Sequence, residues 1–196
     1  MTDAPAPTAA KPAATFSRGK PTALLVLADG TVFEGQGFGA ETASVGEVCF
    51  NTAMTGYEEI LTDPSYAGQI VAFTFPHIGI VGTNNEDVES LTPAVRGMIV
   101  RADAEHPSNY RAISALDRWL KSHNIAAIAG IDTRRLTSVI REKGMPHGVV
   151  AHSPSGKFDV DALVKQARGF PGLVGLDLAK DVTARQSYKW DETPWA

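Results

Sequence analysis

Residues 23–35 read ALLVLADGTVFEG and predict a β-hairpin at the start of the ordered chain. Two apolar runs flank the pair Asp29-Gly30, and an Asp-Gly pair between such runs is a strong signal for a tight turn joining antiparallel strands. The fold is therefore expected to begin with strands.

Further strands and helices follow the hairpin. Short runs rich in β-branched and aromatic residues predict strands over 47–51, 69–75, 96–101, 125–131 and 148–151. Apolar residues at helical spacing predict three helices: 109–123 with Ile113, Leu116 and Leu120 on one face, one capped by Asp132 or Thr133 and stopped at Gly144, and 159–168. Strands that come first and then alternate with helices predict an α/β fold, in which helices pack on mixed β-sheets.

Length and composition narrow the class of protein. A chain of 196 residues, 43% hydrophobic and 20% charged, can bury one apolar core. The net charge of −4 argues against a nucleic-acid or anionic-membrane partner. The longest apolar run, 23–28, is far below the ~20 residues that span a bilayer. The single cysteine excludes an internal disulfide, so we expect a cytoplasmic protein.

The first 21 residues differ from the rest. They hold four of the 12 prolines and six alanines without apolar periodicity, so 1–21 is expected to be a disordered tail. Lys11, Arg18 and Lys20 against Asp3 leave a transit peptide as the alternative, although the prolines disfavour the amphipathic helix that such a peptide needs.

Features that look like functional motifs have simpler explanations. The glycines of 35–39 have the spacing G-x-G-x-G, not the dinucleotide pattern G-x-G-x-x-G, so a glycine-rich strand or bulge is expected. Cys49 lies between apolar neighbours on an expected strand, which predicts a buried, inert thiol. The five histidines lie on separate elements, and no metal site is expected.

The remaining polar candidates lie between residues 58 and 66. Asp63-Pro64-Ser65-Tyr66 predicts a turn, whose Ser65 hydroxyl is able to hydrogen-bond a small polar ligand. Glu58 and Glu59 are adjacent, so on a helix they point in different directions and form a poor acid–base pair. The residues alone indicate no nucleophile–base pair, metal cage or phosphate loop.

One continuous run points to a family. Residues 51–71, NTAMTGYEEILTDPSYAGQIV, closely resemble the N-terminal domain of the small, glutamine-hydrolysing subunit of carbamoyl-phosphate synthetase. Four other stretches agree with that family in the same order, and the resemblance covers roughly residues 22–196: 23–35, 75–84, 123–144 and 170–182.

The resemblance implies a function for a complete subunit. In that family the small subunit hydrolyses glutamine, and the ammonia passes through a tunnel to a large subunit. The large subunit uses ATP, with Mg, and bicarbonate to make carbamoyl phosphate for arginine and pyrimidine biosynthesis. The family is thus a ligase whose subunits form a heterodimer, with higher-order assembly left open. The implied fold is a swivelling β/β/α domain.

The resemblance also implies site residues and domains. Ser65 matches the serine that binds L-glutamine, while Asp63 and Met54 resemble residues near the point where ammonia leaves the glutamine site. The Cys, His and Glu that hydrolyse glutamine belong to a class I amidotransferase domain that 1–196 does not contain. We therefore expect a family domain over 22–183, the start of a linker over 184–196, no catalytic residue or cofactor in this chain, and no glutaminase activity from it alone.

Two other functions stay open at this point. The chain is alternatively a stand-alone interaction module that keeps the docking surface without catalysis. A small-molecule enzyme built around the loop expected at Gly35–Gly39 is the third hypothesis.

Overall fold

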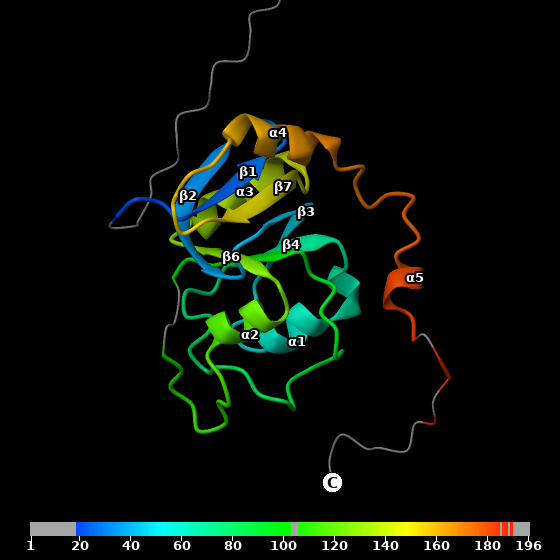
Figure 1. Ribbon diagram of the computed structural model, residues 1–196. Coiled ribbons are helices and arrows are strands. Elements are labelled where there is room, and N and C mark those ends of the chain that lie inside the picture. The colour runs from blue at the N-terminus through cyan, green and yellow to red at the C-terminus, as the bar shows by residue number, and fades with distance from the viewer. Residues whose placement is uncertain (1–18, 103–105, 185, 188, 190–196) are drawn as a thin grey trace, which may run out of the picture.

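The computed structural model describes residues 19–102, 106–184, 186–187 and 189. Its strands are β1 Ala23–Leu27, β2 Val32–Gly39, β3 Ala43–Asn51, β4 Gln69–Phe73, β5 Gly97–Ile99, β6 Ala126–Ala129 and β7 His147–His152. They form one closed barrel in the order β1-β2-β6-β5-β4-β3-β7 (Figure 1). The neighbours from β3 to β6 are parallel, and the remaining pairs are antiparallel. The predicted α/β fold with a mixed sheet is confirmed, whereas closure into a barrel was not predicted.

The expected hairpin at 23–35 is confirmed. β1 and β2 pair antiparallel with Leu25 opposite Phe33. The Leu27 N–H donates to the Thr31 carbonyl at 2.9 Å, and the Asp29 side chain accepts from the Thr31 N–H at 2.9 Å. Gly30 has φ of 91°, a left-handed conformation that glycine adopts without steric cost. This conformation explains why the Asp-Gly pair predicted the turn correctly.

The barrel interior is filled by alternate residues of each strand and is closed by a helix. In β1, Leu25 and Leu27 belong to this interior core, while Leu24 and Val26 belong to an outer cluster. Helix α3 (Thr133–Lys143) packs Leu136 and Ile140 against the interior core. The expected cap is Asp132, whose side chain accepts from the Arg135 N–H at 3.0 Å, and the expected stop at Gly144 is confirmed.

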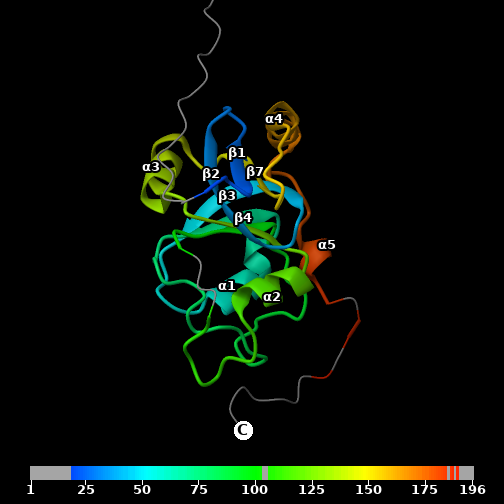
Figure 2. The same cartoon turned by 60° about the vertical axis from the view of Figure 1, so that its left-hand side comes forward.

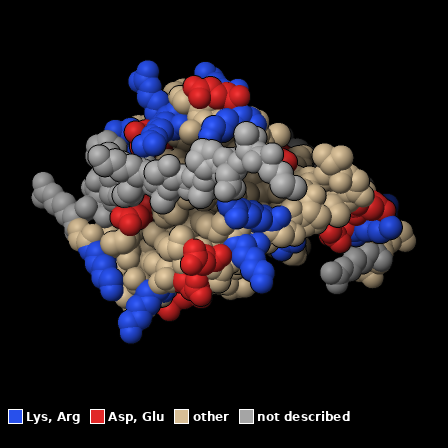
Figure 3. All heavy atoms as spheres, turned by 90° about the horizontal axis from the view of Figure 1, so that it is seen from above, with Lys and Arg blue, Asp and Glu red and all other residues tan. Residues whose placement is uncertain are grey.

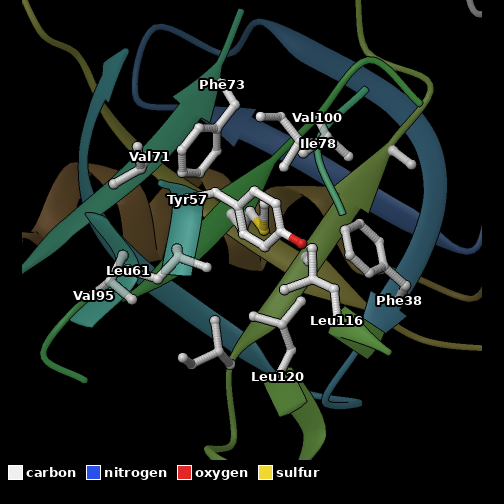
Figure 4. Close-up of a cluster of buried hydrophobic side chains, with 14 of the residues drawn as sticks. Phe38, Tyr57, Leu61, Val71, Phe73, Ile78, Val95, Val100, Leu116 and Leu120 are labelled. Atoms are coloured by element: carbon white, nitrogen blue, oxygen red, sulfur yellow. The ribbon is translucent and has the colours of Figure 1, made fainter. Parts of the chain in front are cut away.

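Two sets of helices cover the outside of the barrel. Helix α4 (Val160–Gly169) packs on β1 and β7 on one side (Figure 2). Helices α1 (Tyr57–Thr62) and α2 (Leu116–Ser122) lie on the opposite side, below the barrel in Figure 1. Figure 4 shows Tyr57 and Leu61 of α1 and Leu116 and Leu120 of α2 facing one cluster with Phe73 of β4.

Helix α2 begins later than the helix that the sequence predicted over 109–123. Residues 109–115 are not helical, and α2 begins at Leu116. The Ile113 N–H donates to the Thr83 carbonyl at 2.9 Å, and Thr83 forms a β-bridge with Ser114. Ile113 is 67% exposed and takes no part in the apolar face. Pairing with a distant loop thus replaces the first helical turns that the spacing of Ile113 and Leu116 predicted.

The glycine-rich run is part of β2, as expected for a glycine-rich strand. A Cβ built on Gly35 would lie 2.2 Å from the Ala129 carbonyl oxygen of β6, and one on Gly37 would lie 2.0 Å from the His152 ring. The strand thus needs glycine for close packing. Residues 35–39 are strand and not loop, so the loop on which the third hypothesis was based is absent there.

Two expectations concern the ends of the chain. The predicted tail over 1–21 lies outside the described residues up to Arg18, as does most of the expected linker over 184–196. Before that linker, 170–178 lead into the short helix α5 (Ala179–Val182), which lies beside the barrel (Figure 1).

Charged side chains of both signs are interspersed on the face seen in Figure 3. This mixture agrees with the small net charge of −4. Within the described ranges, no helix is both long enough and apolar enough to cross a membrane.

Candidate functional site

The predicted site residues lie on the crossover that joins the parallel strands β3 and β4. The crossover consists of a short loop, α1 and the 3-10 turn η1 (Pro64–Tyr66). Tyr57 and Leu61 of α1 are buried against the outer face of the barrel, which holds the crossover in place. The site is therefore built on a rigid support.

Asp63 and Ser65 are brought together in the η1 turn. Asp63 Oδ1 accepts from the Ser65 N–H at 2.8 Å, while Pro64 occupies the first position of the turn. The Tyr66 N–H donates to the Asp63 carbonyl at 3.1 Å and closes the turn. The expected turn is confirmed, and its local geometry follows from the order Asp-Pro-Ser.

The Ser65 hydroxyl is available to a ligand. Ser65 is exposed, and its hydroxyl has no hydrogen-bond partner among the residues that the structure describes. A hydroxyl both donates and accepts, so this group can recognise an amide, an amine or a carboxylate.

Met54 lies at the other end of α1 and does not share the turn. It is 68% exposed, on the loop between β3 and α1. An exposed thioether of this kind offers an apolar contact surface and contributes no hydrogen-bond donor.

Asn51 connects the Met54 loop to the Ser65 turn, a link that the sequence did not reveal. Its Nδ2 donates to the Tyr66 hydroxyl at 2.9 Å, and its Oδ1 accepts from the Ala53 N–H at 2.7 Å. Asn51 and Tyr66 both lie within the run 51–71, but no local spacing rule pairs residues 15 positions apart. One amide side chain therefore sets both ends of the crossover.

Two titratable groups near the crossover are buried. Burial, and then the negative charge of Glu47, raise the pKa of the Cys49 thiol to about 12, so it stays protonated. The prediction of a buried thiol is confirmed. Glu58 is also buried, with 3% of its surface exposed, and its pKa is raised to about 7, chiefly by burial.

Metal coordination has no support in the described ranges. Three or more His, Cys, Asp or Glu side chains are nowhere grouped there so as to hold an ion. The crossover offers instead a hydroxyl, a carboxylate and an apolar side chain. Such a set can bind and orient a polar molecule by hydrogen bonds.

The fold and this turn together define a mixed α/β barrel domain that presents a hydroxyl on a parallel crossover. The family model described as carbamoyl-phosphate synthase small chain, CPSase domain, matches residues 25–150, which include every strand from β2 to β6 and the Asp63–Ser65 turn. The chain belongs to this family.

Individual relatives carry the similarity further along the chain. The carbamoyl phosphate synthase small chain of Mesorhizobium japonicum is 64% identical over 180 residues, which are 90% of this chain and 45% of the relative. The protein of the same name from Bradyrhizobium diazoefficiens is 63% identical over 180 residues, 90% of this chain and 46% of the relative. The chain thus spans about half the length of these curated relatives.

The comparison with solved structures also found distant matches. An aminopeptidase from Aneurinibacillus sp. strain AM-1 superposes with a TM-score of 0.41 at 12% identity, over 69% of this chain and 31% of the other. A similarity of this size carries no argument about function.

Proposed function

We propose that this chain is the N-terminal part of the small subunit of a glutamine-dependent carbamoyl-phosphate synthetase. In this proposal it docks on the large synthetase subunit and completes a glutamine site whose other residues lie in a class I amidotransferase domain. The observation that carries the proposal is the family match over 25–150, which includes the crossover with its exposed Ser65 hydroxyl.

Ser65 is the residue proposed to touch the substrate. The Asp63 carboxylate and Pro64 determine the backbone of the turn, so the Ser65 hydroxyl is presented at a defined place before glutamine arrives. A preorganised hydrogen bond loses little entropy on binding and therefore adds affinity. Asp63 and Met54 are proposed as neighbours of the ammonia exit, with the Asp63 carboxylate already engaged by the Ser65 N–H.

The chemistry of the complete enzyme is assigned to other parts. Glutamine hydrolysis is proposed to need a Cys nucleophile with His and Glu partners, outside 1–196, so this chain alone is expected to be inactive. ATP and Mg are proposed to act in the large subunit, in the cytoplasm. The product would be carbamoyl phosphate for arginine and pyrimidine biosynthesis. The proposal includes the swivelling β/β/α fold that the family resemblance implies for this domain.

The test uses the small subunit that contains these 196 residues together with its amidotransferase domain. We expect it to hydrolyse glutamine and to elute with a large ATP-using subunit in size-exclusion chromatography. An extended chain that does neither would overturn the proposal. A chain that binds the large subunit without any glutaminase activity would instead support the stand-alone interaction module.

A further inference from the structure

Asn51 is the last residue of β3, and the barrel holds its backbone in place. It stands opposite Phe73 in the parallel register between β3 and β4. The Asn51 carbonyl accepts from the Thr74 N–H at 3.1 Å, immediately beyond the end of β4. The Asn51 side chain therefore starts from a backbone position that two paired strands fix.

The amide of Asn51 reaches from the barrel to the turn that carries Ser65. Its Nδ2 donates to the Tyr66 hydroxyl at 2.9 Å, and its Oδ1 accepts from the Ala53 N–H at 2.7 Å. Reversing the amide would place its NH₂ group against the Ala53 N–H, so that two donors would face each other. These two contacts therefore favour one orientation of the Asn51 amide.

Tyr66 is held at both ends of its side chain. Its ring packs on the buried cluster that contains Tyr57 and Leu61 of α1. Its hydroxyl accepts from the Asn51 amide. Since Tyr66 directly follows Ser65 in the chain, these contacts restrict the backbone on the C-terminal side of Ser65.

The Ser65 hydroxyl depends for its position on the residues on either side of it. Among the described residues the hydroxyl has no hydrogen-bond partner, so its place follows from the backbone of the turn. On the N-terminal side, Asp63 accepts from the Ser65 N–H at 2.8 Å, and the ring of Pro64 restricts φ. On the C-terminal side, the turn depends on Tyr66 and thus on Asn51, at the far end of the crossover.

We propose that Asn51 is a positioning residue for the Ser65 hydroxyl, acting through Tyr66. This role rests on the proposed function, in which Ser65 hydrogen-bonds glutamine. Asn51 itself does not touch the substrate; it keeps the turn in the arrangement in which the hydroxyl meets glutamine. A turn that is free to shift has to be ordered when the substrate binds, and this ordering reduces affinity.

The effect should fall on the binding of glutamine. In the proposed function the amide bond of glutamine is broken by residues of the amidotransferase domain, whereas Ser65 holds the bound molecule. A residue that positions one hydrogen bond contributes no more than that bond itself. Loss of the Asn51 contact should therefore raise the glutamine KM about two- to fivefold, with a smaller change in kcat.

The test measures the glutamine KM and kcat of variants of the complete small subunit bound to its large subunit. Tyr66→Phe removes only the hydroxyl and keeps the ring packing, and Asn51→Ala removes the whole amide; both should raise KM. Asn51→Asp keeps an oxygen for the Ala53 N–H and a second one that accepts from the Tyr66 hydroxyl, so its KM should stay near the wild-type value. Tyr110→Phe, at an exposed tyrosine, is the matched control and should leave KM unchanged.

A double-mutant cycle separates positioning from general structural damage. Where Ser65→Ala has already removed the hydroxyl, adding Asn51→Ala or Tyr66→Phe should raise KM no further. Damage to the fold would instead raise KM by the same factor with and without the Ser65 hydroxyl, and that result would overturn the proposal. Thermal melts show that each variant is folded, and Tyr66→Phe serves alone if Asn51→Ala does not fold.

The other outcomes distinguish this role from the proposed function. If Ser65→Ala raises KM while folded Tyr66→Phe and Asn51→Ala do not, Asn51 has no positioning role and the proposed glutamine site stands. An Asn51→Asp variant that is as impaired as Asn51→Ala also contradicts the role. If Ser65→Ala itself leaves KM unchanged, the proposed contact of Ser65 with glutamine is wrong, and the role of Asn51 falls with it.

Discussion

Oδ1 of Asp63 lies 2.8 Å from the backbone nitrogen of Ser65, and this single hydrogen bond shapes the turn that presents the Ser65 hydroxyl. The carboxylate acts as a cap for a 3-10 turn that ends two residues before β4 begins. Residues that satisfy backbone N–H groups in this manner stabilise a turn and also restrict its conformations. The same contact therefore links the stability of the domain to the proposed glutamine site.

Asp63→Ala should destabilise the domain by about 1 kcal/mol, because the Ser65 N–H loses its acceptor. Urea unfolding followed by circular dichroism measures this change. Asp63→Asn retains a side-chain oxygen that accepts from the same N–H, so it should cost clearly less. Equal losses for the two variants would show that the cap does not stabilise the turn.

Tyr66→Phe should cost about 0.5–1.5 kcal/mol of unfolding free energy, because Asn51 Nδ2 loses its hydrogen-bond acceptor. The matched control is Tyr110→Phe, since Tyr110 is 96% exposed and should tolerate the change. Urea unfolding of both variants gives the comparison. If Tyr66→Phe is as stable as the control, Asn51 does not hold the turn in place through Tyr66.

Glu58 should make stability fall as pH rises. Burial raises its pKa from an ordinary 4.5 to about 7, so the folded protein holds this proton more tightly than the unfolded chain. The contribution of Glu58 to stability is therefore complete below pH 4.5 and is lost as the pH rises to about 7. The loss is on the order of 3 kcal/mol, because each pKa unit corresponds to ~1.4 kcal/mol.

Urea unfolding at several pH values between 4.5 and 8 measures this loss, and Glu58→Gln should remove most of it. The pKa values of Asp29, Asp87 and Asp117 are lowered, so these groups act on stability below this range. An equally steep decline in Glu58→Gln would assign the effect to another group.

Gly35→Ala should destabilise the barrel by about 1–3 kcal/mol, since the added methyl group would meet the Ala129 carbonyl oxygen of β6. Gly169→Ala is the control, because no atom lies within 4 Å of that methyl position at the end of α4. The control should stabilise by about 0.5–1 kcal/mol through helix propensity. Thermal melts distinguish the two, and a neutral Gly35→Ala would argue against tight packing between β2 and β6.

The elements of the barrel were predictable because their signals are local. The apolar run of β1, the Asp29-Gly30 turn and the Asp132 cap each depend on residues that are close in sequence. Barrel closure was not predictable, because β1 pairs with β7 more than 100 residues later. The start of α2 was missed for the same reason, since Ile113 bonds to Thr83.

For the candidate site as well, features that depend on neighbouring residues were predictable and contacts between distant residues were not. The Asp63–Ser65 turn was predicted from four consecutive residues, and the buried state of Cys49 from its apolar neighbours. The tie between Asn51 and Tyr66 spans the whole crossover, so no pattern in the sequence indicated it. The sequence predicted only that Glu58 and Glu59 point in different directions, and it did not indicate that Glu58 is buried and accepts from the Asn84 N–H.

The most direct test of the proposed function is the glutamine KM of Ser65→Ala in the complete small subunit bound to its large subunit. Loss of one neutral hydrogen bond corresponds to about 0.5–1.5 kcal/mol, so KM should rise between a few-fold and about tenfold while kcat changes less. Ser138→Ala, at an exposed serine on α3, is the matched control and should leave both constants unchanged. An unchanged KM in Ser65→Ala would remove Ser65 from the glutamine site and contradict the account.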